Sequence, residues 1–446
     1  MGIIVLKFGG TSVEDIAAIG GVAERVAGFC GTEHRIVVVV SAMGSATDDL
    51  VKMAKLVNPK PPPRELDMLL SSGEQVSIAL LAMTLESLGR PAMSFTGGQV
   101  GLQTSHAHTR ARILSVDCNQ IRRTLDEGRI AVVAGFQGVT ESGQITTLGR
   151  GGSDTTALAL AAALRAERCE IFTDVDGVFT ADPRRIPDAR KLERISYDEM
   201  LELAVLGAGV MHPRSVLFGQ RYGIPIRVRN ARNDENGTLI TGVDAMMEEA
   251  AVIGCTLKED LGRITLLGLP ISHGIQSRVF AKLAEEQVFI DDIIQTTAGP
   301  DCINISFTVD HDDLVAVKPA MEAVLREVGL GELDIDVGLS KVSVVGLGMR
   351  SQTGVAAKMF DALRDADVTI SNITTSEIKI SCIVNRPDGE RALKAVHAAF
   401  ELDRVKEKAS TDMLPDPNDG LGERSVLLSE AIRQGTVAGP VKMQGN

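Results

Sequence analysis

The chain has 446 residues, which corresponds to roughly three domains of about 150 residues each. Apolar residues make up 44% of the sequence and charged residues 24%, and this balance excludes wholesale disorder. The formal net charge is −13. Because binding to nucleic acid or to an anionic membrane needs clustered Lys and Arg, we expect neither as a partner.

The cysteines predict the redox compartment. The chain has six, and none stands in the close pairs typical of zinc sites or redox motifs: Cys30, Cys118, Cys169, Cys255, Cys302 and Cys382. The chain begins directly with a predicted strand, and no apolar run is expected to reach the ~18 residues of a membrane span. We therefore expect free thiols in a cytoplasmic protein.

Strands and helices alternate through the first half of the chain. The predicted strands are short, β-branched runs, namely Ile3–Phe8, Ile36–Val40, Ala92–Phe95, Ile130–Phe136 and Cys169–Thr173. The predicted amphipathic helices are Ile16–Phe29, Val76–Leu88, Thr109–Glu127 and Thr155–Leu164. This alternation predicts an α/β fold with a largely parallel sheet between helices, and a site at the carboxyl ends of its strands.

The second half contains a repeat with an offset of 80 residues. The apolar positions of Phe280–Ile293 coincide with those of Phe360–Ile373. The predicted strands around the two copies are Ile264–Leu269, Val288–Gln295, Ile303–Val309, Val342–Leu347, Val368–Thr374 and Ile378–Val384, and the second helices are Leu314–Val328 and Arg391–Phe400. Each copy thus fits the ferredoxin-like βαββαβ motif. From the pattern alone, the repeat could serve packing only, or it could form an interaction surface.

The last stretch, residues 406–446, is rich in Asp, Pro, Gly and Ser and lacks periodicity. These properties predict a flexible tail, in which Ser425–Arg433 could form one short helix.

The first motif, Lys7–Ser12, ends the first predicted strand. Two glycines and two hydroxyl residues allow backbone amides to converge on a phosphate, with Lys7 as a fixed positive charge. An ordinary turn between strand and helix would also explain two glycines. It would not explain a lysine directly after buried strand residues, which needs an anion or an acidic partner.

Two further segments carry polar candidates. Ser41–Gly44 ends the second strand, and Thr47 follows it. Glu74 is predicted near the start of a helix, where its carboxylate could attract a substrate ammonium group. Its alternative role is a carboxylate that interacts with the helix dipole.

The segment Gly149–Thr156 is a glycine-flanked loop that leads into a helix. Arg150 offers a planar guanidinium suited to a carboxylate, and Asp154 could orient a lysine or accept a proton. An N-cap function for Ser153 or Asp154 would account for one residue only, and not for the arginine and glycines.

A polar loop, Thr173–Arg184, follows the last strand of the first half. It is suited to a nucleotide sugar and to metal-bound phosphates, and its spacing does not match a calcium loop. The seven histidines show no metal-binding spacing, so we expect no metal held by protein ligands alone. His106 and His108 are predicted to be solvated loop residues.

Four segments in this order resemble the aspartate kinases, which have the amino-acid kinase fold: Lys7–Ser12, Ser72–Glu74, Gly149–Asp154 and Thr173–Val178. Ala208–Arg214 and Gly348–Ser351 extend the resemblance, which covers roughly Gly2 to Val405. It implies that ATP and L-aspartate react to give ADP and 4-phospho-L-aspartate. This reaction begins the synthesis of lysine, threonine, methionine and, in bacteria, diaminopimelate.

The resemblance also implies residue roles. Lys7 would stabilise charge on the transferring γ-phosphoryl group, and Asp154 would hold Lys7 and the reacting groups in register. Glu74 would pair with the substrate ammonium and Arg150 with its α-carboxylate. The aspartate contacts would be Thr47, Glu74, Arg150, Gly151, Gly152 and Ser153. The ATP contacts would be Lys7, Phe8, Gly9, Gly10, Ser41, Thr173, Asp174, Phe179, Asp182 and Arg184. Mg²⁺ is expected through the ATP phosphates.

The repeats resemble tandem ACT domains, which bind regulatory amino acids. The implied boundaries are 1–245 for the catalytic domain, 262–340 for the first ACT domain, and 251–261 with 341–405 for the second. Lysine, threonine or both would act as inhibitors, with Met349, Ser351, Gln352 and Gly354 as effector contacts. Because ACT units pair edge to edge, a homodimer or larger homo-oligomer is implied.

Two positions depart from the family pattern. The turn of the first repeat carries Ile271 where an acid is expected to hold an effector ammonium, and Phe179 stands where Tyr is common. Two other functions remain open from sequence alone: a kinase of the same fold for another carboxylate or a nucleoside monophosphate, and a catalytically silent amino-acid sensor.

Overall fold

The structure is a computed structural model that describes residues 2–30, 34–243, 250–271 and 274–404. The elements below belong to one unit, Met1–Asp403. The predicted tail, residues 406–446, and the short helix predicted within it lie outside the described residues, as do Ser272 and His273 of the turn in the first repeat.

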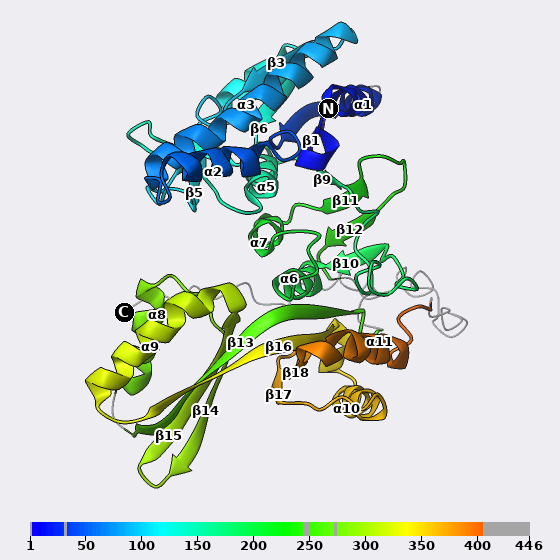
Figure 1. Ribbon diagram of the computed structural model, residues 1–446. Helices are drawn as coiled ribbons and strands as arrows, with labels where there is room; N and C mark the ends of the chain where they lie inside the picture. The colour runs from blue at the N-terminus through cyan, green and yellow to red at the C-terminus, as the bar shows by residue number, and fades with distance from the viewer. Residues whose placement is uncertain (1, 31–33, 244–249, 272–273, 405–446) are drawn as a thin grey trace, which may run out of the picture. The chain divides into compact units, whose positions relative to one another are not determined.

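The first half of the chain forms an eight-stranded sheet (Figure 1). Its order is β10-β12-β11-β9-β1-β2-β6-β3, and all neighbours are parallel except β11 and β12. The strands are β1 (Gly2–Phe8), β2 (His34–Val40), β3 (Ala92–Phe95), β6 (Ile130–Ala134), β9 (Arg168–Thr173), β10 (Arg194–Ser196), β11 (Ile226–Asn230) and β12 (Thr238–Thr241). The predicted α/β class is confirmed, and the carboxyl ends of β9, β1, β2 and β6 share one edge.

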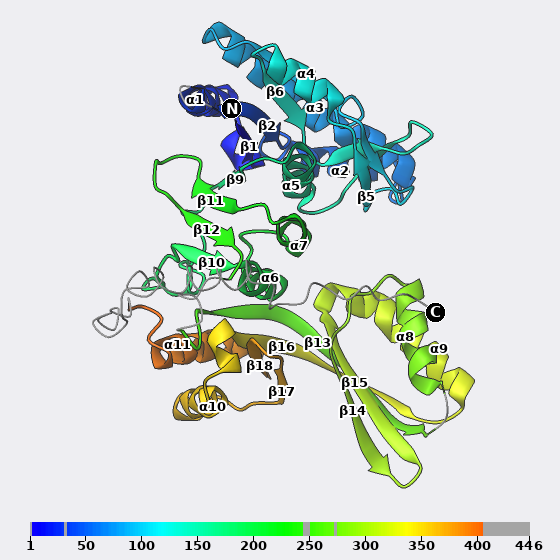
Figure 2. The ribbon, with the colours of Figure 1, turned by 180° about the vertical axis from the view of Figure 1, so that it is seen from behind.

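Helices cover both faces of this sheet (Figures 1 and 2). They are α1 (Ile16–Phe29), α2 (Ala46–Val57), α3 (Pro63–Ser87), α4 (Asn119–Asp126), α5 (Gly152–Leu164), α6 (Tyr197–Val205) and α7 (Pro213–Tyr222), with a short 3₁₀ turn, η1 (Gly10–Ser12). Alternate strand residues face opposite sides. Ile4 and Val38 pack with α1 and α3, whereas Val5 and Val37 pack with α4 and α5. The continuous apolar strands follow from this double coverage.

The helix predicted over Thr109–Glu127 is wrong in its first half. Ile113–Val116 forms strand β5 of a small sheet with the order β5-β4-β7-β8, and the helix there is α4. The other strands are β4 (Leu102–Thr104), β7 (Gln137–Val139) and β8 (Ile145–Thr147). The apolar run of β5 is short and half-exposed, so helical periodicity and strand alternation could not be separated by pattern.

Helix α3 begins well before the predicted Val76. Its first residue is Pro63, which suits a position where no backbone donor is needed. The segment Ser71–Glu74 therefore lies within the helix and does not open it. By length and composition α3 could cross a membrane, contrary to the prediction from apolar runs. However, half of the apolar stretch of this helix is buried inside the protein. For a single core helix this is weak evidence of a membrane span.

The second half forms a six-stranded antiparallel sheet with the order β14-β15-β13-β16-β18-β17. Its strands are β13 (Gly254–Pro270), β14 (Asp291–Gly299), β15 (Cys302–Asp310), β16 (Glu332–Val345), β17 (Asn372–Thr375) and β18 (Lys379–Asn385). The two central strands are long: one half of each pairs with the first repeat and the other half with the second. The repeats thus share one continuous sheet.

Each repeat has its own pair of helices and its own core. The helices are α8 (Ile275–Glu285) and α9 (Leu314–Val328) in the first repeat, and α10 (Val355–Asp365) and α11 (Gly389–Ala399) in the second. Short 3₁₀ turns are η2 (His311–Asp313), η3 (Leu347–Arg350) and η4 (Arg386–Asp388). Leu283 and Leu363, 80 residues apart, are both fully buried. The sequence offset therefore reflects equivalent core positions.

Candidate functional site

Backbone hydrogen bonds join the ends of β9 and β1 to the loops that follow β1 and β2. Gly9 N donates to Phe172 O at 3.2 Å, and Ser41 N donates to Phe8 O at 3.2 Å. Gly44 N donates to Gly10 O at 3.1 Å. A Cβ on Gly10 would lie 3.0 Å from the carbonyl oxygen of Ala42, so only glycine permits this close approach without a shift. The glycine loop and the second-strand loop therefore form one surface at the carboxyl edge.

Lys7 and Asp154 form a nearly buried ion pair at this edge. Lys7 Nζ lies 2.6 Å from Asp154 Oδ1, with side-chain exposures of 11% and 13%. Asp154 is in the first turn of α5, whose N-cap is Gly151, without a side-chain cap. An N-cap function for Ser153 or Asp154 is thus wrong. The buried lysine has the acidic partner that its position in the strand requires.

Glu74 presents an incompletely paired carboxylate. It is 2% exposed on α3, and its Oε1 accepts a hydrogen bond from Ala42 N at 3.2 Å. Within the part of the chain described, Oε2 has no hydrogen-bond partner. Burial raises the pKa of Glu74 to about 7, and backbone hydrogen bonds lower this pKa by a smaller amount. The alternative helix-dipole role is wrong, because Glu74 lies in the middle of the helix.

Arg150 stands exposed on a loop between two glycines with left-handed backbone. Gly149 has φ 77° and Gly151 has φ 69°. A Cβ on Gly151 would lie 2.3 Å from the Cβ of His212, so this loop packs tightly against the N-cap of α7. Burial lowers the pKa of His212. The nearby charges of Arg214 and Arg150 lower it further, whereas that of Asp154 raises it. Arg150 and the ion pair are therefore close to one histidine.

The remaining candidates for aspartate contacts differ in placement. Gly152 and Ser153 form the start of α5, and Ser153 packs against Gly135 just after β6. Thr47 is half-buried near the start of α2. Among the residues that the structure describes, no hydrogen bond joins the side chain of Thr47 to another predicted site residue.

The predicted nucleotide loop lines a cavity of 490 Å³. Five candidates share this lining: Thr173, Asp174, Phe179, Asp182 and Arg184. The guanidinium of Arg184 donates to both oxygens of Asp182 at 3.0 and 2.8 Å, and these hydrogen bonds lower the pKa of Asp182. The other ATP candidates, Lys7 to Gly10 and Ser41, are outside this lining, at the adjacent strand ends.

Sequence reasoning missed other residues that line this cavity. Gly209 and Val210 lie there, from the motif Ala208–Arg214 that had received no role. Cys255 and Leu257 of β13 also line it, with Leu393 of α11. No local sequence signal marks Cys255, Leu257 and Leu393, since they come from the second half of the chain.

The effector candidates gather around a surface hollow of 540 Å³. Met349, Gln352 and Gly354 line it, together with Thr375 and Glu377. Ser351 is not part of the lining, and its hydroxyl donates to Gly348 O at 3.2 Å. In the first repeat, Ile271 is 59% exposed.

In the described ranges, no group of three or more His, Cys, Asp or Glu could hold a metal ion. His108 differs from the predicted solvated residue, because its Nδ1 lies 2.7 Å from Asp67 Oδ2.

Comparison with known proteins gives two family matches. Residues 2–230 match the amino acid kinase family, and residues 342–400 match the ACT domain. The chain is 49% identical to an aspartokinase of Bacillus sp. strain MGA3 over 402 residues, covering 90% of this chain and 98% of that protein. It is also 49% identical to an aspartokinase of Thermus thermophilus, covering 91% and 100% of the two chains.

Solved structures show the same similarity. Aspartokinase III of E. coli in complex with aspartate and ADP has a TM-score of 0.76 and 26% identity, covering 89% of this chain and 99% of that one. The same enzyme with lysine and aspartate has a TM-score of 0.70 and 27% identity, with the same coverage.

Proposed function

The chain belongs to the aspartokinases, within the amino acid kinase family, and from this membership we propose how its own residues perform the reaction. It is an ATP-dependent kinase that transfers the γ-phosphoryl group to the β-carboxylate of L-aspartate, giving ADP and 4-phospho-L-aspartate. The observation that carries the residue assignment is the buried Lys7–Asp154 pair at the strand edge, beside loops suited to phosphate.

Lys7 stabilises the negative charge on the transferring phosphoryl group, and Asp154 fixes the position of the lysine ammonium. Phosphoryl transfer depends mainly on positioning and charge stabilisation, so a pre-oriented cation in a nearly dry site contributes strongly. The residues proposed to contact ATP are Lys7, Phe8, Gly9, Gly10, Ser41, Thr173, Asp174, Phe179, Asp182 and Arg184. ATP enters as its Mg²⁺ complex, with the ion held largely by phosphates and water.

Glu74 and Arg150 bind the two charged groups of aspartate that do not react. The unpaired Oε2 of Glu74 suits the ammonium, and the exposed fork of Arg150 suits the α-carboxylate. The β-carboxylate is then free to attack the γ-phosphorus in line. Thr47, Gly151, Gly152 and Ser153 complete the proposed aspartate contacts.

The regulatory assignment rests on the shared sheet. The proposed boundaries are 1–245 for the catalytic domain, 262–340 for the first ACT domain, and 251–261 plus 341–405 for the second. Lysine, threonine or both inhibit the enzyme, with Met349, Ser351, Gln352 and Gly354 near the second-repeat effector. The enzyme acts in the cytoplasm as a homodimer or larger homo-oligomer, at the start of lysine, threonine and methionine synthesis.

The test is ADP release with ATP, Mg²⁺ and L-aspartate, with hydroxylamine to trap the acyl phosphate. Aspartate-dependent turnover with trapped hydroxamate is the expected result, and lysine plus threonine should suppress it. N-acetyl-L-glutamate in place of aspartate is the control acceptor and should give no hydroxamate. Folded protein that binds an amino acid without turnover would contradict the catalytic assignment.

A further inference from the structure

The loop that carries Arg150 needs support from outside itself. Gly149 and Gly151 flank the arginine, and glycine leaves the backbone conformationally free. The side chain of Arg150 is exposed. Its position relative to Glu74 must nevertheless be fixed, because the two groups bind opposite ends of one small substrate.

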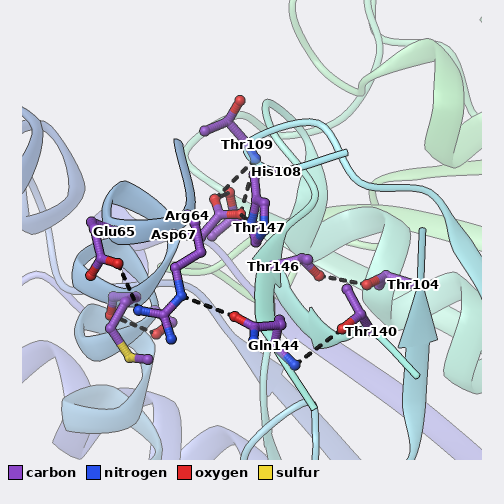
Figure 3. A network of polar contacts seen from close by, with 12 residues as sticks. Arg64, Glu65, Asp67, Thr104, His108, Thr109, Thr140, Gln144, Thr146 and Thr147 are labelled. Carbon is purple, nitrogen blue, oxygen red and sulfur yellow. Dashed lines mark hydrogen bonds and ion pairs between the residues drawn. The ribbon is translucent and has the colours of Figure 1, made fainter. Parts of the chain in front are cut away.

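Asp67 supports the loop from one side (Figure 3). This carboxylate is fully buried on α3, and its Oδ1 accepts a hydrogen bond from Thr147 Oγ1 at 2.6 Å. It also accepts from Thr109 N at 3.0 Å, and its Oδ2 lies 2.7 Å from His108 Nδ1.

The position of Asp67 on α3 connects the two proposed ends of the aspartate site. Glu74 lies seven residues further along the same helix, which is two turns and brings it to the same face. Thr147 precedes Arg150 by three residues. Asp67 therefore joins the helix that carries the ammonium-binding carboxylate to the strand end that leads to the arginine.

Arg214 supports the same loop from α7. Its guanidinium donates to Leu148 O at 2.8 Å and also to Ala111 O. Ala111 N in turn donates to Thr147 O at 2.9 Å. The strand end at Thr147 and Leu148 is thus held by a buried carboxylate on one side and a half-buried guanidinium on the other.

We propose that Asp67 and Arg214 are positioning residues for aspartate, which fix Arg150 at the separation from Glu74 that the substrate requires. The inference rests on the proposed roles of Glu74 and Arg150. Neither positioning residue is needed to touch the substrate. A small displacement of a binding group can greatly reduce the efficiency of a reaction that depends on alignment, so loss of either support should weaken aspartate use in particular.

Thr147 offers the sharpest pair of variants. Thr147→Val keeps the shape and removes the hydroxyl that bonds Asp67, whereas Thr147→Ser keeps the hydroxyl. We expect the KM for aspartate to rise about tenfold or more in Thr147→Val, with the KM for ATP within about twofold of the starting protein. Thr147→Ser should restore most of the aspartate affinity.

A second pair tests Arg214 independently. Arg214→Lys keeps the charge and cannot span two carbonyl groups, so it should raise the KM for aspartate in the same way. Arg122 of α4 is the matched control, since its guanidinium also donates to a backbone carbonyl, that of Ala163 on α5, at 3.0 Å. Arg122→Lys should leave both KM values unchanged.

The outcomes separate this inference from the proposed function. If Arg150→Ala leaves the KM for aspartate unchanged, the assigned role of Arg150 is wrong and the inference fails with it. If Arg150→Ala raises that KM while Thr147→Val and Arg214→Lys lower only the thermal midpoint, the two supports are merely structural. Equal rises in the KM for ATP and for aspartate would also overturn the inference.

Discussion

At the residue scale, the proposed chemistry depends on a lysine whose charge is nearly removed from water. Lys7 is the penultimate residue of β1, and its ammonium is paired with Asp154. Lys7→Ala should lower kcat by about 10²- to 10³-fold, as expected for loss of one pre-oriented charge contact to the transition state. The measurement is hydroxamate formation at saturating ATP and aspartate.

The control for Lys7 is Lys52, an exposed lysine of α2 that pairs with Asp49 at 3.0 Å. Lys52→Ala removes the same charge and should leave turnover unchanged. If a folded Lys7→Ala protein retains near-normal kcat, the role assigned to Lys7 is wrong.

Glu74 predicts a pH dependence of aspartate use. Burial raises its pKa to about 7, and the substrate ammonium needs the ionised carboxylate. The kcat/KM for aspartate should therefore rise with pH up to about 7 and then level off, since this ratio reports groups of the free enzyme. In Glu74→Gln the kcat/KM for aspartate should be at least about tenfold lower, and its rise with pH up to about 7 should disappear. An unchanged rise with pH in this variant would show that another group causes the pH dependence.

The same shift has a consequence for stability. The pKa of Glu74 in the folded protein is above its unfolded value of 4.5. Its contribution to the free energy of unfolding is therefore fully present below pH 4.5 and is lost as the pH rises through about 7. The free protein thus becomes less stable over this range on account of Glu74, and a bound ammonium group would oppose the loss.

The sequence could identify these residue types but not all of their surroundings. Lys7 and Asp154 stood out because a charged residue lay beside a buried or glycine-rich segment, whereas the role predicted for Glu74 came from the family resemblance. The unpaired oxygen of Glu74 could not be predicted, because it depends on contact between the middle of α3 and the loop after β2. The bond between His108 and Asp67 spans 41 residues and has no local pattern.

At the scale of elements, the capping box of α6 contains a glutamate that also bonds the turn after β16. Glu199 Oε2 accepts from Ser196 N at 3.2 Å, which completes a capping box. Its other oxygen accepts from Leu347 N at 3.0 Å, at the start of η3. Glu199 is 1% exposed, so its loss leaves buried donors unsatisfied.

Glu199→Ala should therefore lower the free energy of unfolding by about 1–3 kcal/mol. Urea denaturation, with the midpoint and slope compared, measures this change. Glu202→Ala on the same helix is the control, because it removes an ion pair to Lys379 that is partly exposed and should cost at most about 1 kcal/mol. Equal losses in both variants would contradict a special role for the shared cap.

Element prediction from sequence succeeded where one periodicity dominated. The helices Ile16–Phe29 and Leu314–Val328 have the predicted bounds, since their apolar residues recur with helical spacing over several turns. It failed at Ile113–Val116, where four residues are too few to separate strand from helix. It also truncated β16, which begins at Glu332. The first half of that strand is the edge of the core, and its alternating apolar residues Leu333, Ile335 and Val337 were overlooked because none of them is fully buried there.

At the scale of the whole molecule, the second sheet contributes to the cavity proposed for the nucleotide. Cys255 N, on β13, donates to Thr180 O at 2.7 Å, and Thr180 Oγ1 lies 3.2 Å from His397 Nε2 of α11. β13 then continues to Pro270, next to the turn of the first repeat. One strand therefore extends from the lining of the cavity proposed for the nucleotide to the turn where the family pattern places an effector contact.

Ile271 follows directly on this strand and predicts how the enzyme responds to lysine. It stands where the aspartate kinase pattern has an acid, and an alkyl side chain cannot pair with an effector ammonium. Lysine alone should therefore inhibit weakly, and Ile271→Asp should lower the lysine concentration for half-inhibition by about tenfold, as expected for one contact between charged groups.

The measurement is hydroxamate formation across a lysine titration, with and without threonine, and with ATP and aspartate held at fixed concentrations. Val315→Asp is the control, because Val315 is 85% exposed on α9 and the substitution adds the same charge to the same repeat away from the turn. It should leave lysine inhibition unchanged. Strong inhibition of the unaltered enzyme by micromolar lysine alone would show that the first repeat binds its effector without this acid. If both substitutions lower the lysine concentration for half-inhibition equally, the effect comes from net charge. Only Ile271→Asp places the added carboxylate at the turn.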